Sequence, residues 1–309
     1  MEQRFEDIAE YLHSATDFIR WGASRFAEAD LHYGHGTDNP LDEAVALVLH
    51  ALHLPHGCPD RLLDARLTSP EKADIYRLLA RRVDERVPAA YLTGEAWFAG
   101  LKFKTDERAL VPRSPIAELI EARFEPWVTA DDVSAVLDLC TGGGCIAIAC
   151  AHAFGEAHID AVDLSADALA LARENIELHG VENQLELHEG DLFAPLPERR
   201  YDIIVSNPPY VDADDMAALP NEFRHEPELG LAAGADGLDI ARRILAEAAG
   251  WLTENGILVV EVGNSAVALA AMFPDVEFTW LDFERGGEGV FLLSRAELET
   301  HAAAFRGAA

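Results

Sequence analysis

The stretch Asn207-Pro208-Pro209-Tyr210 combines residue types that could hold a planar group carrying an NH2. It follows residues 201–205, an apolar and β-branched run that predicts a buried strand. Two prolines end this strand because neither can donate a ladder hydrogen bond, so Asn207 should lie at the strand's carboxyl end, where open α/β sheets bind ligands. The Asn207 amide and the Pro208 carbonyl offer acceptors, and Tyr210 offers a flat apolar face. The stretch predicts a site for an amide or an exocyclic base amine, with a plain proline-rich turn as the alternative.

The elements that must position this stretch begin near residue 131, where predicted strands and helices start to alternate. Predicted strands cover residues 133–140, 158–164, 184–189, 201–207 and 257–262, and predicted helices cover residues 144–154, 166–179 and 239–252. Such alternation is typical of a mostly parallel, doubly wound sheet. Two final strands, 276–283 and 289–294, have a connection too short for a parallel crossover, so we predict an antiparallel pair. The predicted fold class is α/β and Rossmann-like, with an antiparallel final strand.

The chain divides into three predicted segments. Residues 1–90 form a small helical domain, because apolar residues recur at helical spacing and Thr68-Ser69-Pro70-Glu71 resembles a capping box. We expect this domain to serve in substrate recognition. Residues 91–130 form a linker with a short β-hairpin and a helix, and residues 131–309 form the α/β domain that carries the site.

A glycine-rich loop, Cys140-Thr141-Gly142-Gly143-Gly144, lies between the first strand and the first helix of the α/β domain. Glycines allow a tight turn and the close approach of a ligand, and the following helix offers free N–H groups. Gly142, Gly144 and Ala147 also match the dinucleotide-binding pattern, with Asp163 near the expected acidic position. The loop alone therefore leaves NAD and S-adenosyl-L-methionine open, whereas the absence of Gly-Lys-Ser/Thr disfavours a P-loop.

Polar side chains follow the neighbouring predicted strands. Asp163 ends the second strand, where its carboxylate could accept hydrogen bonds from both ribose hydroxyls. Asp191 follows the third strand and could accept from an adenine amine while Leu192 covers a ring face, and Asn207 ends the fourth strand. An NAD enzyme would also need a hydride-transfer site, and the stretch from Asn207 to Tyr210 supplies none. Each aspartate taken singly could be only a helix N-cap, but their joint placement favours a nucleoside cofactor.

These motifs resemble a known family. Thr-Gly-Gly-Gly-Cys at residues 141–145 and Asn-Pro-Pro-Tyr, after a helical N-terminal domain, look like the HemK-type protein-(glutamine-N5) methyltransferases, and the resemblance covers nearly the whole chain. Residues 111–119 depart from the Pro-Arg-Pro-Glu-Thr-Glu usual in the release-factor enzymes. Residues 219–231 look like the PrmB branch, which methylates a glutamine of the third large-subunit ribosomal protein. Gly143, often Ser or Thr in relatives, is a mild departure.

The resemblance implies a class I methyltransferase fold, S-adenosyl-L-methionine as cofactor, and a glutamine side-chain amide of a ribosomal protein as methyl acceptor. The implied cofactor-binding residues are Phe98, Cys140, Thr141, Gly142, Gly143, Gly144, Asp163, Asp191, Leu192 and Asn207. Asn207, Pro208 and Tyr210 would be catalytic and, with Pro209, would hold the glutamine. Three alternatives stay open: a release-factor glutamine methyltransferase, a DNA or RNA adenine-N6 methyltransferase, and a ribosome-assembly protein with a vestigial cofactor site.

The charge of the chain bears on its partner. The 309 residues include 24 Lys and Arg against 55 Asp and Glu, a formal net charge of −31. Nucleic-acid binding depends on basic side chains, so we expect no direct sequence-specific binding of nucleic acid. A basic ribosomal protein would suit this field, and an acidic surface adapted to a salty cytoplasm explains the charge equally well.

Other features of the sequence narrow the location and the ligands. With four cysteines a disulfide framework is not expected, no apolar run is long enough to span a membrane, and residues 1–7 lack the pattern of a signal peptide, so we expect a cytoplasmic protein. His50, His53, His56 and Cys58 match no zinc spacing, and no metal is expected. Residues 211–239 predict a loop that covers the substrate, with a surface insertion as the alternative.

Overall fold

The computed structural model describes residues 8–309 and separates into two compact units. One unit extends to Glu95 and includes Pro220–His225, and the other comprises Ala96–Leu219 and Glu226–Ala309. The expected absence of a signal peptide concerns residues 1–7, which lie outside the described residues. Within residues 8–309, no helix combines the length and the apolar character needed to cross a membrane.

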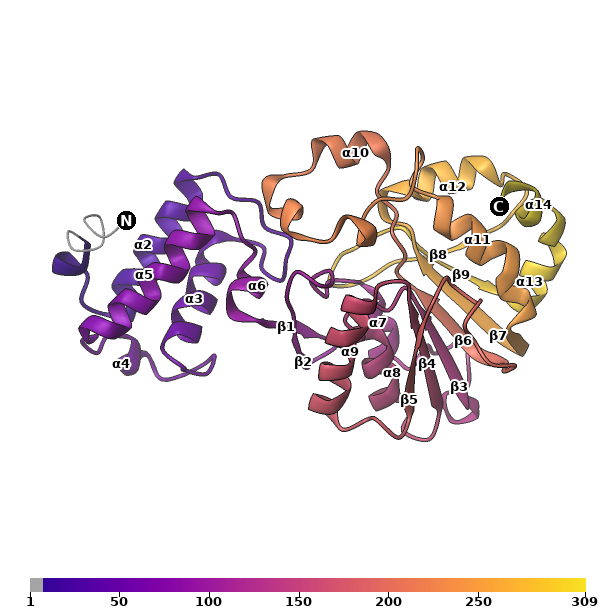
Figure 1. Ribbon diagram of the computed structural model, residues 1–309, viewed down its shortest axis with the longest axis horizontal. Coiled ribbons are helices and arrows are strands. Elements are labelled where there is room, and N and C mark those ends of the chain that lie inside the picture. The colour runs from indigo at the N-terminus through magenta and orange to yellow at the C-terminus, as the bar shows by residue number, and fades with distance from the viewer. Residues whose placement is uncertain (1–7) are drawn as a thin grey trace. The chain divides into compact units, whose positions relative to one another are not determined.

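The first unit is helical and has its own core (Figure 1). Its helices are α2 (Ala15–Glu28), α3 (Pro40–Ala51), α4 (Asp60–Leu63), α5 (Ser69–Asp84) and α6 (Ala89–Thr93). Local sequence sets where the longer helices begin: Ser14 and Asp17 form a capping box, Asn39 accepts from the first backbone N–H groups of α3, and Thr68 forms a second capping box. The apolar stripes of α2, α3 and α5 pack together around Phe18 and other fully buried side chains.

A buried cluster of charges lies inside this helical unit. Arg82 is fully buried and donates to Glu43 Oε1 (2.6 Å), Glu222 Oε1 (3.3 Å) and the carbonyl of His32 (2.8 Å). Glu222 comes from the long segment after the Asn-Pro-Pro-Tyr stretch, which also contains α10 (Ala213–Ala218) and short 3-10 turns. The predicted irregular loop is therefore partly helical, and one of its turns is held by buried ion pairs.

The second unit contains a seven-stranded sheet and a separate two-stranded hairpin. The strands are β1 (Glu95–Phe98), β2 (Leu101–Lys104), β3 (Ala135–Leu139), β4 (His158–Asp163), β5 (Leu185–Glu189), β6 (Tyr201–Ser206), β7 (Leu252–Glu261), β8 (Thr279–Leu281) and β9 (Val290–Ser294). The helices are α7 (Ile116–Glu121), α8 (Cys145–Ala153), α9 (Ala166–His179), α10, α11 (Asp239–Glu247), α12 (Ala266–Met272), α13 (Arg295–Thr300) and α14 (Ala302–Ala308). The strand order is β5-β4-β3-β6-β7-β9-β8, parallel up to β7, with β9 antiparallel to both of its neighbours. This confirms the predicted mostly parallel α/β sheet with its antiparallel end.

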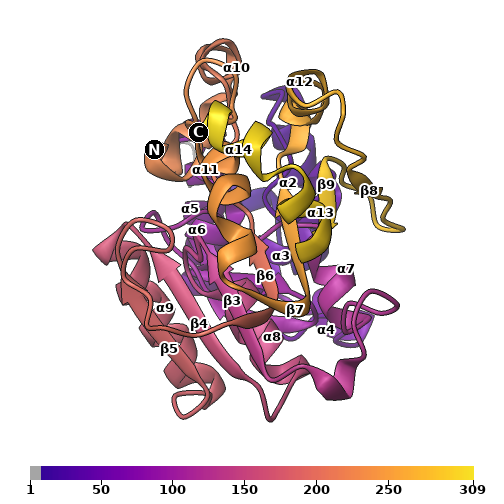
Figure 2. The same ribbon diagram turned by 90° about the vertical axis from the view of Figure 1, so that its right-hand side faces the viewer.

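The two faces of the sheet are covered by different helices (Figure 2). Side chains alternate along each strand, so Val136 packs with α7 and α8 on one face and Leu137 packs with α11 and α14 on the other. Burial on both faces explains why the strands appear in the sequence as nearly continuous apolar runs.

The predicted end of one helix and the predicted start of the next strand were both wrong. The sequence predicts a helix to residue 252 and a strand from 257, whereas α11 ends at Glu247 and β7 begins at Leu252. The polar run 253–256 favours a turn, but Leu252 pairs with Tyr201 across a register shift in the ladder. Gly256 permits this because a Cβ there would lie 2.8 Å from the Tyr201 carbonyl oxygen.

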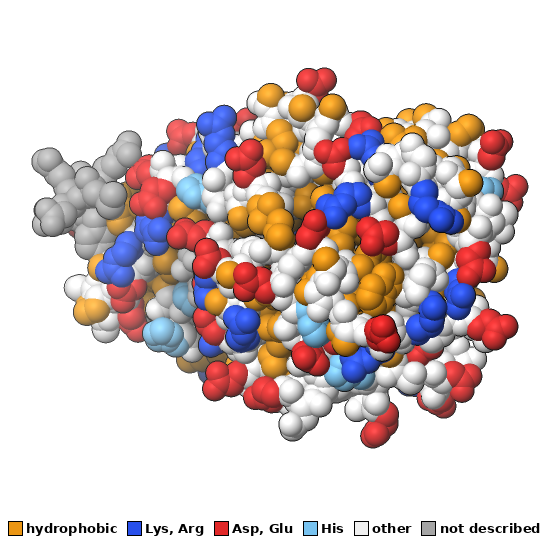
Figure 3. Space-filling model, turned by 45° about the vertical axis from the view of Figure 1, so that its right-hand side comes forward, with side chains coloured by type: hydrophobic (Ala, Val, Ile, Leu, Met, Phe, Trp, Pro, Cys, Tyr) orange, Lys and Arg blue, Asp and Glu red, His pale blue; other side chains and the backbone are white. Residues whose placement is uncertain are grey.

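The net charge of −31 predicts a protein that becomes more stable as salt is added. Acidic side chains are spread over the visible face of the molecule (Figure 3), so they repel over a Debye length of ~30 Å at 0.01 M salt but only ~3 Å at 1 M. Buried pairs such as Arg82 with Glu43 are screened much less. Each kcal/mol of repulsion removed should raise Tm by about 2–4 °C in a unit of this size.

Thermal melts in dilute buffer and in concentrated KCl measure this effect, and an uncharged osmolyte at matched osmolality is the control. A Tm that stays flat or falls with KCl would show that the acidic surface does not destabilise the fold.

Candidate active site

The residues predicted to form the site lie along one edge of the sheet. Strands β5, β4, β3 and β6 are parallel neighbours, so their carboxyl ends lie side by side (Figure 1). Asp163 is the last residue of β4, the glycine loop follows β3, Asn207 follows β6, and Asp191 comes two residues after β5. The topology therefore brings together residues that are far apart in the sequence.

The loop after β3 has the backbone that its glycines predict. Cys140, Gly142 and Gly144 have φ values of 58°, 57° and 82°, in the left-handed region. Thr141 donates its backbone N–H to the Val162 carbonyl of β4 (3.0 Å), which holds the loop against the neighbouring strand. A Cβ on Gly142 would meet only the Ala109 methyl group, at 3.8 Å, so the backbone here is open to a ligand.

The side chain of Asn175, in α9, also holds the glycine loop in place. Its side chain is buried, donates to the carbonyls of Gly143 (2.9 Å) and Lys104 (3.1 Å), and accepts from the Lys104 N–H (2.8 Å). Asn175 thus ties the loop to β2. The sequence analysis missed this residue, because an asparagine inside a helical pattern gives no signal of its distant partners.

Asp163 has a double role in the structure. Its Oδ2 accepts from the Gly142 N–H and its Oδ1 from the Ser165 N–H, both at 2.8 Å. Burial raises the pKa of this carboxyl above its usual range. Each carboxylate oxygen has a further lone pair, so Asp163 can shape the loop and still accept from a ligand hydroxyl.

Three further predicted cofactor residues, Asp191, Leu192 and Phe98, have different environments. Asp191 is exposed and pairs with Arg243 (2.8 Å). Leu192 is buried in the core with a φ of 49°. Phe98 is also buried, in β1, where its ring meets that of Phe103 edge-on. Asp191 is thus accessible at the sheet edge, whereas Leu192 and Phe98 pack mainly against protein.

A buried carboxylate beneath the glycine loop tests whether the site suits a cofactor. Asp138 Oδ2 accepts from the Thr141 hydroxyl (2.5 Å) and the Ala147 N–H (3.1 Å). Its Oδ1 is buried without a hydrogen-bond partner among the described residues, and burial raises the pKa of the carboxyl to about 7. An unpaired buried oxygen is costly, so Asp138 suits a bound group that supplies a donor at this loop.

The Asn-Pro-Pro-Tyr stretch leaves the sheet at the next strand. The Ser206 hydroxyl donates to the Leu139 carbonyl (2.7 Å), which fixes the end of β6 beside the glycine loop. Asn207 is half-buried, and no hydrogen bond engages its side chain within residues 8–309. Pro208 is buried and Tyr210 is half-buried, with its hydroxyl donating to Glu261 Oε1 (3.0 Å). The Asn207 amide is therefore available to a ligand next to the loop.

Two buried glutamates near this stretch were missed by the sequence analysis. Glu261 ends β7, the strand beside β6, and Glu226 accepts from the Arg113 guanidinium at 2.6 and 2.8 Å. The signal for Glu261 was a carboxylate directly after the apolar run 257–260.

Comparisons with known proteins identify the family of the chain. The methyltransferase small domain family matches residues 126–226. The chain is 55% identical over 296 residues to the ribosomal protein uL3 glutamine methyltransferase of Xanthomonas campestris pv. campestris, covering 96% of each chain. It is 47% identical over 306 residues to the enzyme of the same name from Francisella tularensis subsp. tularensis, covering 99% of this chain and 98% of that one. The chain belongs to this glutamine methyltransferase family.

Membership of the family confirms that the chain is a methyltransferase and that its methyl donor is S-adenosyl-L-methionine. It also decides between the two cofactors that the glycine loop left open. The open backbone at Gly142, the acceptors of Asp163 and the unpaired Asp138 Oδ1 fit a nucleoside group that carries hydrogen-bond donors.

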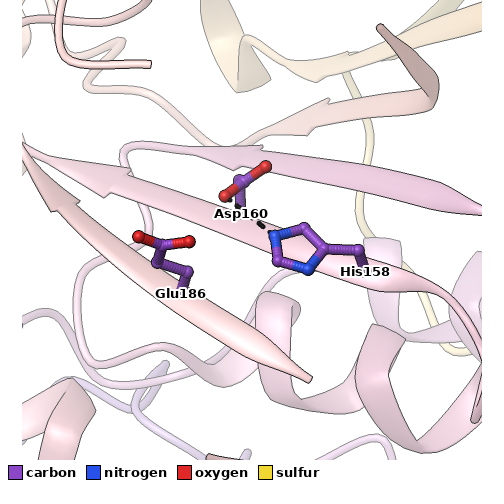
Figure 4. A group of neighbouring side chains, drawn as sticks. All are labelled: His158, Asp160 and Glu186. Atoms are coloured by element: carbon purple, nitrogen blue, oxygen red, sulfur yellow. Dashed lines mark hydrogen bonds and ion pairs between the residues drawn. The ribbon is translucent and has the colours of Figure 1, made fainter. Parts of the chain in front are cut away.

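A second polar cluster lies away from this edge. His158, Asp160 and Glu186 come from β4 and β5 and have ligand-type atoms within 4.8 Å of one another (Figure 4). Asp160, however, already accepts from His188 (2.7 Å), the Tyr201 hydroxyl (2.8 Å) and Arg199. The arginine and the hydrogen bonds satisfy the carboxylate of buried Asp160, whereas Glu186 is exposed, so the cluster is explained as a polar network around one buried carboxylate of the sheet.

Proposed function

We propose that this methyltransferase transfers a methyl group from S-adenosyl-L-methionine to the side-chain amide nitrogen of a glutamine in ribosomal protein uL3. The observation that carries the proposal is the position of Asn207, with an unengaged side-chain amide, at the strand end beside the glycine loop. The two relatives, whose names state this substrate, support the choice of uL3.

The substrate end of the site orients an amide. An amide nitrogen is a poor nucleophile because its lone pair is delocalised into the carbonyl, so alignment is the main task of the protein. We assign the Asn207 side-chain oxygen and the Pro208 carbonyl as acceptors for the two amide hydrogens, which favours the charge that develops on the nitrogen. Pro209 and Tyr210 would bound the planar amide, and solvent can take the proton that the methylated amide loses.

The donor end holds the cofactor, whose sulfonium supplies a good leaving group when it is bound. We assign Asp163 as acceptor for the ribose hydroxyls, Asp191 as acceptor for the adenine amine, and the backbone of residues 140–144 as the cradle. Leu192 would support the base from the core side. Phe98 is assigned only an indirect role, because it packs against Phe103.

The remaining parts of the chain would select the partner. We propose that the N-terminal segment, residues 1–90, recognises the substrate protein, that residues 91–130 link it to the catalytic domain of 131–309, and that residues 211–239 cover the substrate. The net charge of −31 favours a basic ribosomal protein over nucleic acid. None of the four cysteines forms a disulfide in residues 8–309, which supports a cytoplasmic location.

The test compares three candidate methyl acceptors. Purified enzyme with isotopically labelled S-adenosyl-L-methionine is offered uL3, a release factor and duplex DNA separately, at low salt. We expect label in uL3. Label in the release factor alone would favour the alternative of a release-factor glutamine methyltransferase. Label in DNA alone would overturn the assignment of a protein substrate.

A further inference from the structure

We propose that Glu261 is a positioning residue that holds the Tyr210 ring in place at the substrate end of the site. The inference rests on the proposed function and adds a residue that acts through Tyr210 rather than on the substrate. It comes from one feature of the structure: a buried carboxylate that ends the strand beside β6 and is hydrogen-bonded to the tyrosine of the Asn-Pro-Pro-Tyr stretch.

The contacts of Glu261 join three segments of the catalytic unit. Its Oε1 accepts from the Tyr210 hydroxyl (3.0 Å), and its Oε2 accepts from the Ser114 hydroxyl (2.5 Å). The side chain is only 6% exposed. Ser114 also accepts from the Ile116 N–H (3.2 Å), at the start of α7. A buried carboxylate is costly unless it is hydrogen-bonded, so the geometry of these donors is strongly favoured once Glu261 is in place.

The rest of Tyr210 is held just as closely. The Ser265 hydroxyl donates to the Tyr210 carbonyl (3.0 Å). Gly263 lies against the ring, because a Cβ there would be 2.6 Å from Tyr210 Cε2. Gly237 lies against the backbone, where a Cβ would be 2.2 Å from the Tyr210 carbonyl oxygen. The backbone and one side of the ring are thus fixed by packing, and the hydroxyl is fixed by Glu261.

A second glutamate holds the segment that supplies Ser114. Glu226 is buried, accepts two hydrogen bonds from Arg113, and accepts from the Val111 N–H (3.1 Å). These bonds hold Arg113, the residue before Ser114, and its positive charge acts on the Glu261 carboxyl. This is the segment, residues 111–119, in which the sequence departs from the release-factor enzymes.

The direction of the hydrogen bond defines the role of Tyr210. The Tyr210 hydroxyl donates its single proton in a hydrogen bond to Glu261. Burial together with the negative charge of Glu261 raises the pKa of the phenol. The phenol therefore stays neutral. Its ring packs against the substrate amide in a fixed position, and the hydroxyl does not act as a general base. Glu261 contributes by keeping the Tyr210 ring in one orientation.

A set of three variants tests this role. Tyr210→Phe removes the hydrogen bond from one side and Glu261→Ala from the other, while Glu261→Gln keeps an oxygen that can accept from the phenol. We expect Glu261→Ala to lower kcat for uL3 by ~10²-fold, as expected for lost alignment, and Glu261→Gln to recover at least about tenfold of that loss. The dissociation constant for S-adenosyl-L-methionine, measured by calorimetry, should change by less than about threefold because the cofactor residues lie on other strands.

The double variant Tyr210→Phe/Glu261→Ala tests whether the two residues act through their hydrogen bond to each other or act independently. If both residues act through one hydrogen bond, the double variant should be less impaired than the product of the two single effects predicts. Fully multiplicative effects, or a loss of cofactor affinity as large as the loss of kcat, would overturn the proposal. Glu254→Ala, an exposed glutamate on the same strand, is the matched control and should leave kcat unchanged.

A measurement without substrate keeps this inference distinct from the proposed function. A crystal structure of each protein should show the Tyr210 ring in one well-ordered position in the wild type and displaced, or in several positions, in Glu261→Ala. If uL3 is not methylated but the ring is displaced in this way, the substrate assignment fails and the positioning role stands. An unchanged ring position in Glu261→Ala would overturn the positioning role even if uL3 is methylated.

Discussion

Replacing Asn207 by alanine is expected to reduce methyl transfer to uL3 by ~10²-fold or more while cofactor affinity stays nearly unchanged. The Asn207 side chain makes no hydrogen bond inside residues 8–309, so its removal breaks no hydrogen bond of the fold. Its loss should instead leave the substrate amide without one of its two acceptors. Single-turnover rates and calorimetry with S-adenosyl-L-methionine measure the two effects separately.

Asn183→Ala is the matched control for this experiment. Asn183 is an exposed asparagine before β5, and its replacement should leave the rate unchanged. An Asn207→Ala enzyme that keeps more than about a tenth of the wild-type rate would contradict the orienting role, because lost alignment should cost more than that.

Replacing Asp163 by alanine is expected to weaken binding of S-adenosyl-L-methionine by about 1.5–3 kcal/mol, the range for hydrogen bonds to a charged group. Two reasons support this expected loss. The carboxylate is the acceptor that we propose for the ribose, and it also accepts from the Gly142 N–H at 2.8 Å, so the glycine loop loses part of its support. Calorimetry measures the affinity, and thermal melts without cofactor measure the effect on the loop and the fold.

Two further variants are compared with Asp163→Ala. Asp163→Asn keeps one acceptor and should lose less affinity than Asp163→Ala. Asp275→Ala, at an exposed position after α12, should leave affinity unchanged. Unchanged affinity in Asp163→Ala would mean that this residue serves only as a cap for the turn at Ser165.

The sequence predicts the sheet well because its strands are buried on both faces and contrast with the turns between them. The expected helix at 166–179 coincides with α9, which Ser165 caps at its beginning and Gly180 at its end. The start of β7 was not predictable, because Leu252 pairs with Tyr201 through a polar stretch whose local composition favours a turn. Tertiary pairing decides such positions over local propensity.

In the candidate site, too, contacts between residues far apart in the chain could not be predicted from local sequence. The positions of Asp163 and Asn207 at neighbouring strand ends could be predicted, because parallel strands bring their carboxyl ends together. Asn175 and Glu261 could not, since their roles depend on partners 71 and 51 residues away in the chain. A glutamate after an apolar strand is equally compatible with a surface position, and only the fold shows that it is buried.

The most direct test of the account is to locate the methyl group on the product. Purified uL3 is incubated with the enzyme and S-adenosyl-L-methionine, digested, and analysed by tandem mass spectrometry, with the Asn207→Ala enzyme in parallel. The account predicts the added mass of one methyl group on the side-chain amide of a glutamine with the wild-type enzyme, and almost none with Asn207→Ala. Methyl groups found on lysine, arginine or another residue type, or equal glutamine methylation by both enzymes, would contradict it.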